Sequence, residues 1–251
     1  MVIVAAVSTG HTLTKVVDDF VKDYKAEDAE FVTYQPLSDA DMEKLEQEYD
    51  VILDHSRYKD VNVESGDLKG ATIRVFPMPE KLNLCEVRDG HEPGDGEALL
   101  TQDFADVHDI KVGDTISLGA YDYKVSAYTT KADYIYMLEK LSGYIDSEKF
   151  ALVVVDRKEY DKIEADEASY YSIKYNKDNS KEVREKLNAD YVIASYMAAT
   201  TNTRISMPVN EGDAVTNMAT MYAPVMFIII ITLVVLSLIH ISEPTRLRRI
   251  S

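Results

Sequence analysis

The feature that most constrains this chain is an apolar segment near its carboxyl end. No Asp, Glu, Lys or Arg occurs between Asp213 and Glu243, and residues 223–239 read APVMFIIIITLVVLSLI, with two hydroxyls as their only polar groups. A helix needs roughly 20 mostly apolar residues to cross a bilayer, and in lipid it satisfies its own backbone hydrogen bonds. We therefore predict a transmembrane helix over residues 214–235, with a buried core helix or strand as the alternative. The residues that carry this prediction are Ala223, Pro224, Phe227, Ile228, Ile229, Ile230, Ile231 and Leu233.

The last residues have a separate interpretation. Residues 236–246, LSLIHISEPTR, read as the in-frame translation of a sequencing adapter, and the residues after them fit its continuation. Residues 236–251 are therefore interpreted as adapter-derived and are excluded from fold reasoning. On this interpretation the gene is cut within the predicted span and further helices follow in the intact protein. The alternative is a genuine Arg-rich tail beside the membrane.

The amino end has two open interpretations. The segment MVIVAAV is apolar, too short to cross a bilayer and without the basic region of a signal peptide. Residues 1–10 are either the end of a preceding transmembrane helix or a short buried strand or disordered terminus. Apolar residues at helical spacing from Leu13 to Tyr24 then predict an amphipathic helix.

Composition narrows the class of protein. The 251 residues include 44 acidic and 27 basic side chains, for a formal net charge of −17, and no basic stripe precedes the last residues. A nucleic-acid partner is therefore not expected. The single cysteine, Cys85, excludes an internal disulfide framework and a multi-cysteine metal site.

Between the two apolar ends, short strands alternate with short helices, which predicts an α+β fold. The pattern predicts helices over 38–49, 102–108, 158–165 and 180–188, the first opened by a capping box at Ser38-Asp39-Ala40-Asp41. It predicts strands over 29–34, 51–63, 71–76, 115–118, 123–128, 151–155, 169–175 and 191–196. Pro77 and Pro79 are expected to end the third strand.

No residue pattern in this chain predicts an enzyme. The sequence contains no G-x-x-x-x-G-K-[ST] phosphate loop, no G-x-S-x-G and no H-E-x-x-H. Residues 89–97 form an acidic, Gly-rich loop, but its spacing fails the EF-hand pattern. The histidines outside the tail, His11, His55, His91 and His108, are scattered. We predict no catalytic residue, no metal ligand and no cofactor, whereas Tyr134, Tyr136 and Tyr144 are either core residues or an interaction surface.

The middle of the chain carries a series of motifs in a fixed order. They are RDGHEPGDGEALL at 88–100, Phe104-Ala105, KVGDTI at 111–116 and YKV at 123–125. In this order the motifs resemble the extracytoplasmic domain of FtsX-like (MacB-type) permeases of ABC transporters. The residues that carry the resemblance in a structural role are Gly90, Pro93, Glu97, Phe104, Val112, Gly113 and Asp114. The chain departs from the family at Ala127, where glycine is common.

The resemblance implies a multi-pass protein of the cell membrane with residues 11–213 outside the cytoplasm. It implies two subdomains, a mixed α/β one of roughly 11–80 with 145–213 and a β-rich one of 81–144. It also implies a separate cytoplasmic ABC ATPase as partner, a permease dimer or pseudo-dimer, contact with membrane lipid, and a role in export or handling of an amphiphilic, peptide or lipoprotein cargo. ATP hydrolysis would belong to the partner.

Two other classes of protein stay open. A single-span extracytoplasmic ligand-binding or sensor protein would share the apolar helix and the acidic domain. A membrane-anchored hydrolase would need a nucleophile–base pair or a metal set, which the sequence pattern does not indicate.

Overall fold

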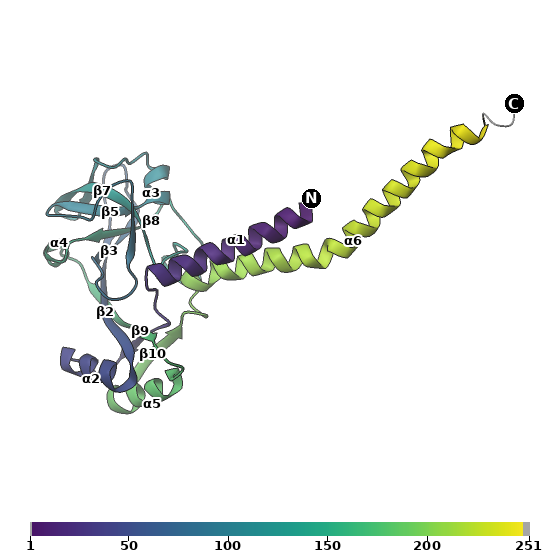
Figure 1. Cartoon of the computed structure of the whole chain (residues 1–251). Coiled ribbons are helices and arrows are strands. Elements are labelled where there is room, and N and C mark those ends of the chain that lie inside the picture. The colour runs from purple at the N-terminus through teal and green to yellow at the C-terminus, as the bar shows by residue number, and fades with distance from the viewer. Residues whose placement is uncertain (1, 248–251) are drawn as a thin grey trace. The chain divides into compact units, whose positions relative to one another are not determined.

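The computed structural model describes residues 2–247, and their side chains except those of 2–11, 209, 223, 226 and 235–247. The chain divides into two units, one made of residues 2–18 with 208–247 and one of Asp19–Met207. We call the second the folded unit, and each unit is described by itself. Figure 1 labels most of the helices and strands along the chain.

The described residues contain both helices and strands, which confirms the predicted α+β class. The helices are α1 (Val2–Asp23), α2 (Asp39–Tyr49), α3 (Gln102–Val107), α4 (Arg157–Lys162), α5 (Ser180–Tyr191) and α6 (Thr203–Leu247). The strands are β1 (Ala29–Thr33), β2 (Val51–Asn62), β3 (Thr72–Pro77), β4 (Cys85–Arg88), β5 (Glu97–Thr101), β6 (Thr115–Leu118), β7 (Tyr121–Lys131), β8 (Phe150–Val155), β9 (Glu167–Tyr175) and β10 (Ile193–Ala198).

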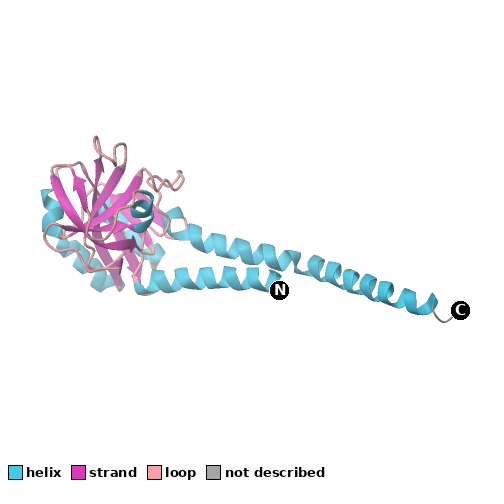
Figure 2. Ribbon diagram, turned by 90° about the horizontal axis from the view of Figure 1, so that it is seen from above, coloured by secondary structure: helices cyan, strands magenta, loops and turns pink. Residues whose placement is uncertain are grey.

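The strands of the folded unit form one mixed sheet, drawn in magenta in Figure 2. Its order is β10-β1-β9-β2-β3-β8-β5-β7-β4, and β6 pairs with β7 off this path. The pairs β3–β8 and β5–β7 are parallel, and the others are antiparallel. Parallel neighbours need crossover connections, so strands far apart in the sequence lie side by side.

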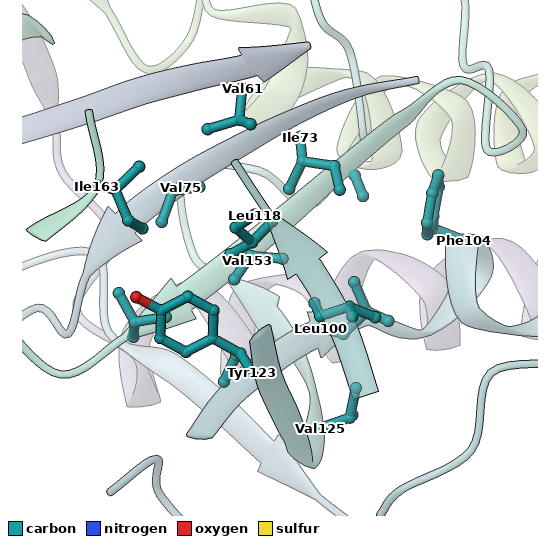
Figure 3. Packing of buried hydrophobic residues seen from close by; sticks show 14 of the residues in the cluster. Val61, Ile73, Val75, Leu100, Phe104, Leu118, Tyr123, Val125, Val153 and Ile163 are labelled. Atoms are coloured by element: carbon teal, nitrogen blue, oxygen red, sulfur yellow. The ribbon is translucent and has the colours of Figure 1, made fainter. Parts of the chain in front are cut away.

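Strand β8 shows how the sheet is covered on both faces. All six of its residues are buried, as expected for a continuous apolar run rather than an alternating one. Because successive side chains point to opposite faces, Val153 lies in one core cluster and Val154 in another. Figure 3 shows the first cluster, in which Ile73 and Val75 of β3 meet Leu100 and Tyr123.

A separate cluster lies under the two longer helices of the folded unit. Leu45 of α2 and Leu187 of α5 pack with Phe31 of β1, Leu53 of β2 and Ile173 of β9. Each helix therefore buries one apolar stripe against the sheet, as amphipathic helices do.

Several predicted boundaries are wrong by a few residues, among them both ends of β7 and the start of β9. Helix α4 ends at Lys162, not at 165, because the buried Lys59 amine donates to the carbonyls of Tyr160 and Ile163. Helix α5 runs on to Tyr191, so β10 starts two residues later than predicted. Strand β3 includes Pro77, which pairs with Val155 at the last position of the parallel ladder.

Helix α6 contains the predicted membrane span and begins earlier than predicted. Among the described residues it is the one helix long and apolar enough to cross a membrane, over Thr203–Val234, and only 6% of its most apolar window is buried. A core helix would be mostly buried, so the alternative of a buried core helix is wrong, and the chain is suited to a membrane. Residues 2–10 are helical as part of α1, so the alternative of a short strand or disordered terminus there is wrong. The side chains of residues 2–10, 223 and 236–247, and the whole of residues 1 and 248–251, lie outside what the structure describes.

The capping box of α2 is present as predicted. Ser38 Oγ accepts from the Asp41 amide at 3.2 Å, and Asp41 Oδ2 accepts from the Ser38 amide at 3.0 Å. We expect Ser38→Ala to lower the free energy of unfolding by about 1 kcal/mol, measured by chemical denaturation of the full chain in a mild detergent. Ser65→Ala, in an exposed turn, is the control and should change stability by less than about 0.5 kcal/mol; equal losses in both would refute the cap's contribution.

Candidate functional site

The residues of the family-like motifs converge on one short stretch of β7. The Gly113 amide donates to the Val125 carbonyl at 2.8 Å, Glu97 pairs with Lys124, and the His91 amide donates to the Ser126 carbonyl. Loops from three parts of the chain thus meet at residues 124–126. Their role here is to build the fold.

The remaining motif residues complete these turns. Glu97 Oε2 accepts from the Gly94 amide at 3.1 Å and lies 3.0 Å from His91 Nε2, while Asp114 Oδ2 accepts from the Lys111 amide at 2.8 Å. Phe104 is buried in the first core cluster. Pro93 is half-buried, and Val112 is exposed in the turn before β6. Ala127, where the family often has glycine, is fully buried.

A second set of residues, of which the sequence patterns indicated only Tyr134, forms a largely buried polar cluster in the folded unit. Its members are charged or hydrogen-bonding side chains drawn from seven segments of the chain. We call this set the polar cluster: Glu27, Glu30, Asp60, Arg74, Asn83, Lys131, Asp133, Tyr134, Tyr170, Ser172 and Arg204.

One part of the polar cluster joins the segment after α1 to the loop before β4. Asn83 Oδ1 accepts from the Glu27 amide at 2.9 Å, and Asn83 Nδ2 donates to Glu27 Oε2 at 2.9 Å and to Ser172 Oγ at 3.0 Å. The Glu27 side chain is only 2% exposed. Two backbone bonds, from the Asn83 amide to the Lys25 carbonyl and from the Leu84 amide to the Tyr24 carbonyl, strengthen the attachment.

A second part lies at the end of β7. Lys131 Nζ donates to Asp133 Oδ1 at 2.5 Å, and the Tyr170 hydroxyl donates to Asp133 Oδ2 at 2.8 Å. The side chains of Lys131 and Asp133 are 2% and 1% exposed. Charges so deeply buried persist only when paired and hydrogen-bonded, and this pair meets both conditions.

A third part holds the first turn of α6. Arg204 donates from Nε to the Leu138 carbonyl at 3.0 Å and from Nη2 to the Glu139 carbonyl at 3.0 Å, and its guanidinium lies 4.3 Å from the centre of the Tyr134 ring. The Tyr134 hydroxyl in turn accepts from Arg74 Nη1 at 2.8 Å. Tyr134 is buried, so it is a core residue and not part of an exposed surface, whereas Tyr144 is exposed.

The register of the sheet brings the two helix connections together. Ala29, at the start of β1, pairs with Ala198, at the end of β10, and the Ala199 amide donates to the Asp28 carbonyl at 2.8 Å. The segment that follows α1 and the segment that leads into α6 are therefore side by side in the folded unit. Both are bonded to the polar cluster.

Burial changes the proton affinity of several groups in the polar cluster. Burial, with the nearby carboxylates of Asp133 and Glu30, raises the pKa of Glu27 to about 8. Burial and Asp133 also raise the pKa of Glu30. The pKa of Tyr170 is raised well above its usual value for the same reasons, and burial raises the pKa of the neighbouring Cys85 thiol to about 12. Cys85 is therefore an unreactive core thiol.

The folded unit also carries a charged cleft of about 500 Å³ beside β2. Among the residues lining it are Asp54, His55, Arg57, Glu80, Lys81 and Arg157. Its cations are paired with carboxylates: Arg57 with Glu167 at 3.6 Å, Lys81 with Glu46 at 2.9 Å and Arg157 with Glu80 at 3.2 Å. Burial and Arg57 lower the pKa of His55, which stacks on Tyr171.

Within the described residues no group of three or more His, Cys, Asp or Glu side chains is arranged to hold a metal ion. His55 and His108 lie in different parts of the folded unit, where His108 Nε2 contacts the Glu148 carbonyl at 2.9 Å. The prediction that the chain has no catalytic or cofactor-binding residue remains a prediction.

Comparison with known proteins adds little to this geometry. No family model and no curated protein matches the chain. Among solved structures, a protein described as a lipoprotein from Bacillus anthracis is similar with a TM-score of 0.32 and 9% identity, over 68% of this chain and 96% of that chain. A similarity at this level supports neither a fold family nor a function for this chain.

Proposed function

We propose that this chain is part of the membrane-spanning permease of an FtsX-like ABC transporter. The folded unit lies outside the cytoplasm, and the intact protein is multi-pass and acts as a dimer or pseudo-dimer. A separate cytoplasmic ATPase hydrolyses ATP, and the helices pass its motion to the folded unit, which handles an amphiphilic, peptide or lipoprotein cargo.

The observation that supports this proposal best is the attachment of both helix connections to the same buried cluster. Tyr24 and Lys25, after α1, are bonded to the loop before β4, and Arg204, in the first turn of α6, is bonded to the segment after β7. Groups with little exposure that are hydrogen-bonded to one another resist local opening. A displacement of either connection would therefore shift the interior of the folded unit and not merely bend a loose linker.

The test is a reconstitution of the intact permease with the ATPase encoded beside its reading frame. The two should form a complex in liposomes, and Arg204→Ala should lower permease-dependent ATP hydrolysis by about fivefold or more, because the coupling between helix and folded unit weakens. Arg184→Ala, an exposed residue of α5, is the matched control and should stay within about twofold. Absence of a complex, or of further membrane spans in the intact reading frame, would refute the proposal.

The charged cleft favours a second candidate, a single-span extracytoplasmic ligand-binding protein. A volume of about 500 Å³ suits a small ligand, and its paired charges suit a ligand that carries both signs. This candidate predicts that the intact reading frame ends after one span, and that ligand binding is lost in Arg57→Ala while Arg204→Ala binds normally.

A further inference from the structure

The polar cluster contains a carboxyl pair whose hydrogen bonding is incomplete when both groups are ionised. Glu27 Oε2 accepts from Asn83, but among the described residues no donor reaches the buried Glu27 Oε1. Glu30 of β1 lies opposite Ser172 of β9, and Asn83 Nδ2 donates to both Ser172 Oγ and Glu27 Oε2, so Glu30 lies beside the network that holds Glu27. Two ionised carboxylates only accept hydrogen bonds, so neighbouring Glu27 and Glu30 can bond to each other, and fill the empty place at Glu27 Oε1, only if one of them carries a proton.

We propose that Glu27 and Glu30 form a proton-binding site that holds one shared proton between their carboxyl groups at neutral pH. In this arrangement Glu27 Oε1 carries the proton and donates it to the Glu30 carboxylate. Glu27 Oε1, which otherwise has no hydrogen-bond partner, thereby gains a hydrogen bond. The inference concerns the folded unit alone and holds whether or not the chain belongs to a transporter.

The charges that face the pair favour a single proton. Asp133 faces both carboxyl groups, Lys131 and Arg204 face Glu30, and Asn83 and Ser172 bond Glu27. The further titratable groups beside the pair are Tyr170, which faces both carboxyls, and Tyr134 and Cys85, which face Asp133. With one shared proton the pair carries a single negative charge. The positive charge of Lys131 then balances the negative charge of Asp133, and the positive charge of Arg204 balances the negative charge of the pair.

Loss of the proton would leave an additional uncompensated negative charge in this buried site, which is unfavourable. The site lies where the connection from α1 enters β1, next to the bonds that hold Tyr24 and Lys25. Deprotonation would therefore weaken the attachment of that connection. The bound proton acts as a stabilising ligand of the folded state.

The sign of the pH dependence follows from the raised pKa of Glu27. The ordinary value is 4.5 and the folded-state value is about 8. Below the unfolded-state pKa the bound proton contributes its full stabilisation of the folded state. This stabilisation declines as the pH rises from about 4.5 to about 8, and above that it does not change further. Relative to a variant without this site, the equilibrium constant for unfolding should rise by up to about tenfold per pH unit in this window.

The experiment compares the full chain in a mild detergent with Glu27→Gln, by chemical denaturation at intervals from pH 5 to pH 9. Gln reproduces the protonated carboxyl group, since its oxygen accepts from Asn83 and its amide nitrogen donates to Glu30. We expect Glu27→Gln to stay within about fivefold of the wild type at pH 5 and to be at least about tenfold more favoured in the folded state at pH 8. Glu164→Gln, on an exposed loop, is the control and should show the wild-type slope.

A second measurement does not depend on any variant folding. The infrared spectrum of the wild-type chain should contain a protonated-carboxyl band at pH 7 that disappears as the pH is raised to 10, and Glu27→Gln should lack that band. Absence of the band from the wild type at pH 7, or an unchanged pH slope in a folded Glu27→Gln, would overturn the proposal.

Discussion

Gly90→Ala is expected to destabilise the folded unit by about 3 kcal/mol or more, the range of severe single substitutions. A methyl group on Gly90 would lie 1.9 Å from the Ser126 carbonyl oxygen and 2.8 Å from the Ala127 Cβ. Neither neighbour can retreat, because both belong to β7, which is paired with β4, β5 and β6. The chain must therefore open at this loop or displace the strand.

The measurement is chemical denaturation of the full chain in a mild detergent, followed by circular dichroism. Gly94→Ala, in the same loop, is the matched control. Its added methyl would meet only the Glu97 carboxylate, at 3.3 Å, which can shift by a few tenths of an ångström. We expect a change of no more than about 1 kcal/mol there. Equal effects of the two substitutions would show that the close approach of Gly90 to β7 is not what constrains this loop.

Arg74→Met is expected to cost about 3 kcal/mol, because it leaves partners of a buried guanidinium without their donor. Arg74 donates to both oxygens of Asp60, at 2.8 and 2.7 Å, and to the Tyr134 hydroxyl. Its side chain is 6% exposed, but Asp60 is 35% exposed and keeps part of its hydration. The loss should therefore fall at the lower end of the range for broken buried ion pairs.

Two further variants distinguish the stability lost with the ion pair from the stability lost with side-chain packing. Arg157→Met breaks the exposed pair with Glu80 and should cost less than about 1 kcal/mol. Asp60→Asn, combined with Arg74→Met, removes the unpaired charge and should recover part of the loss. No recovery in the double variant would indicate that the loss does not come from the unpaired Asp60 charge. It would then come from the lost bond to Tyr134 and the lost packing against Tyr58, whose ring centre lies 4.2 Å from the guanidinium.

Much of the secondary structure could be predicted because its causes are local. The Ser38 capping box, the alternation of Tyr123 and Val125 and the apolar run of β8 each lie within a few residues of chain. The long apolar helix near the carboxyl end was predictable for the same reason, since hydropathy alone separates lipid from water. Its start at Thr203 was not, because there the boundary depends on the bonds of Arg204 to Leu138 and Glu139.

The sequence by itself therefore determined the α+β class, most helices and strands other than β4 and β5, and the segment suited to a membrane. Only the tertiary structure decided which polar side chains meet. Glu27, Asn83, Asp133 and Arg204 are ordinary polar residues in the sequence, and nothing in their spacing brings them together. They become a site because the pairing of β1 with β9 and β10 carries distant segments into one buried volume. There, desolvation makes each charge depend on its neighbours.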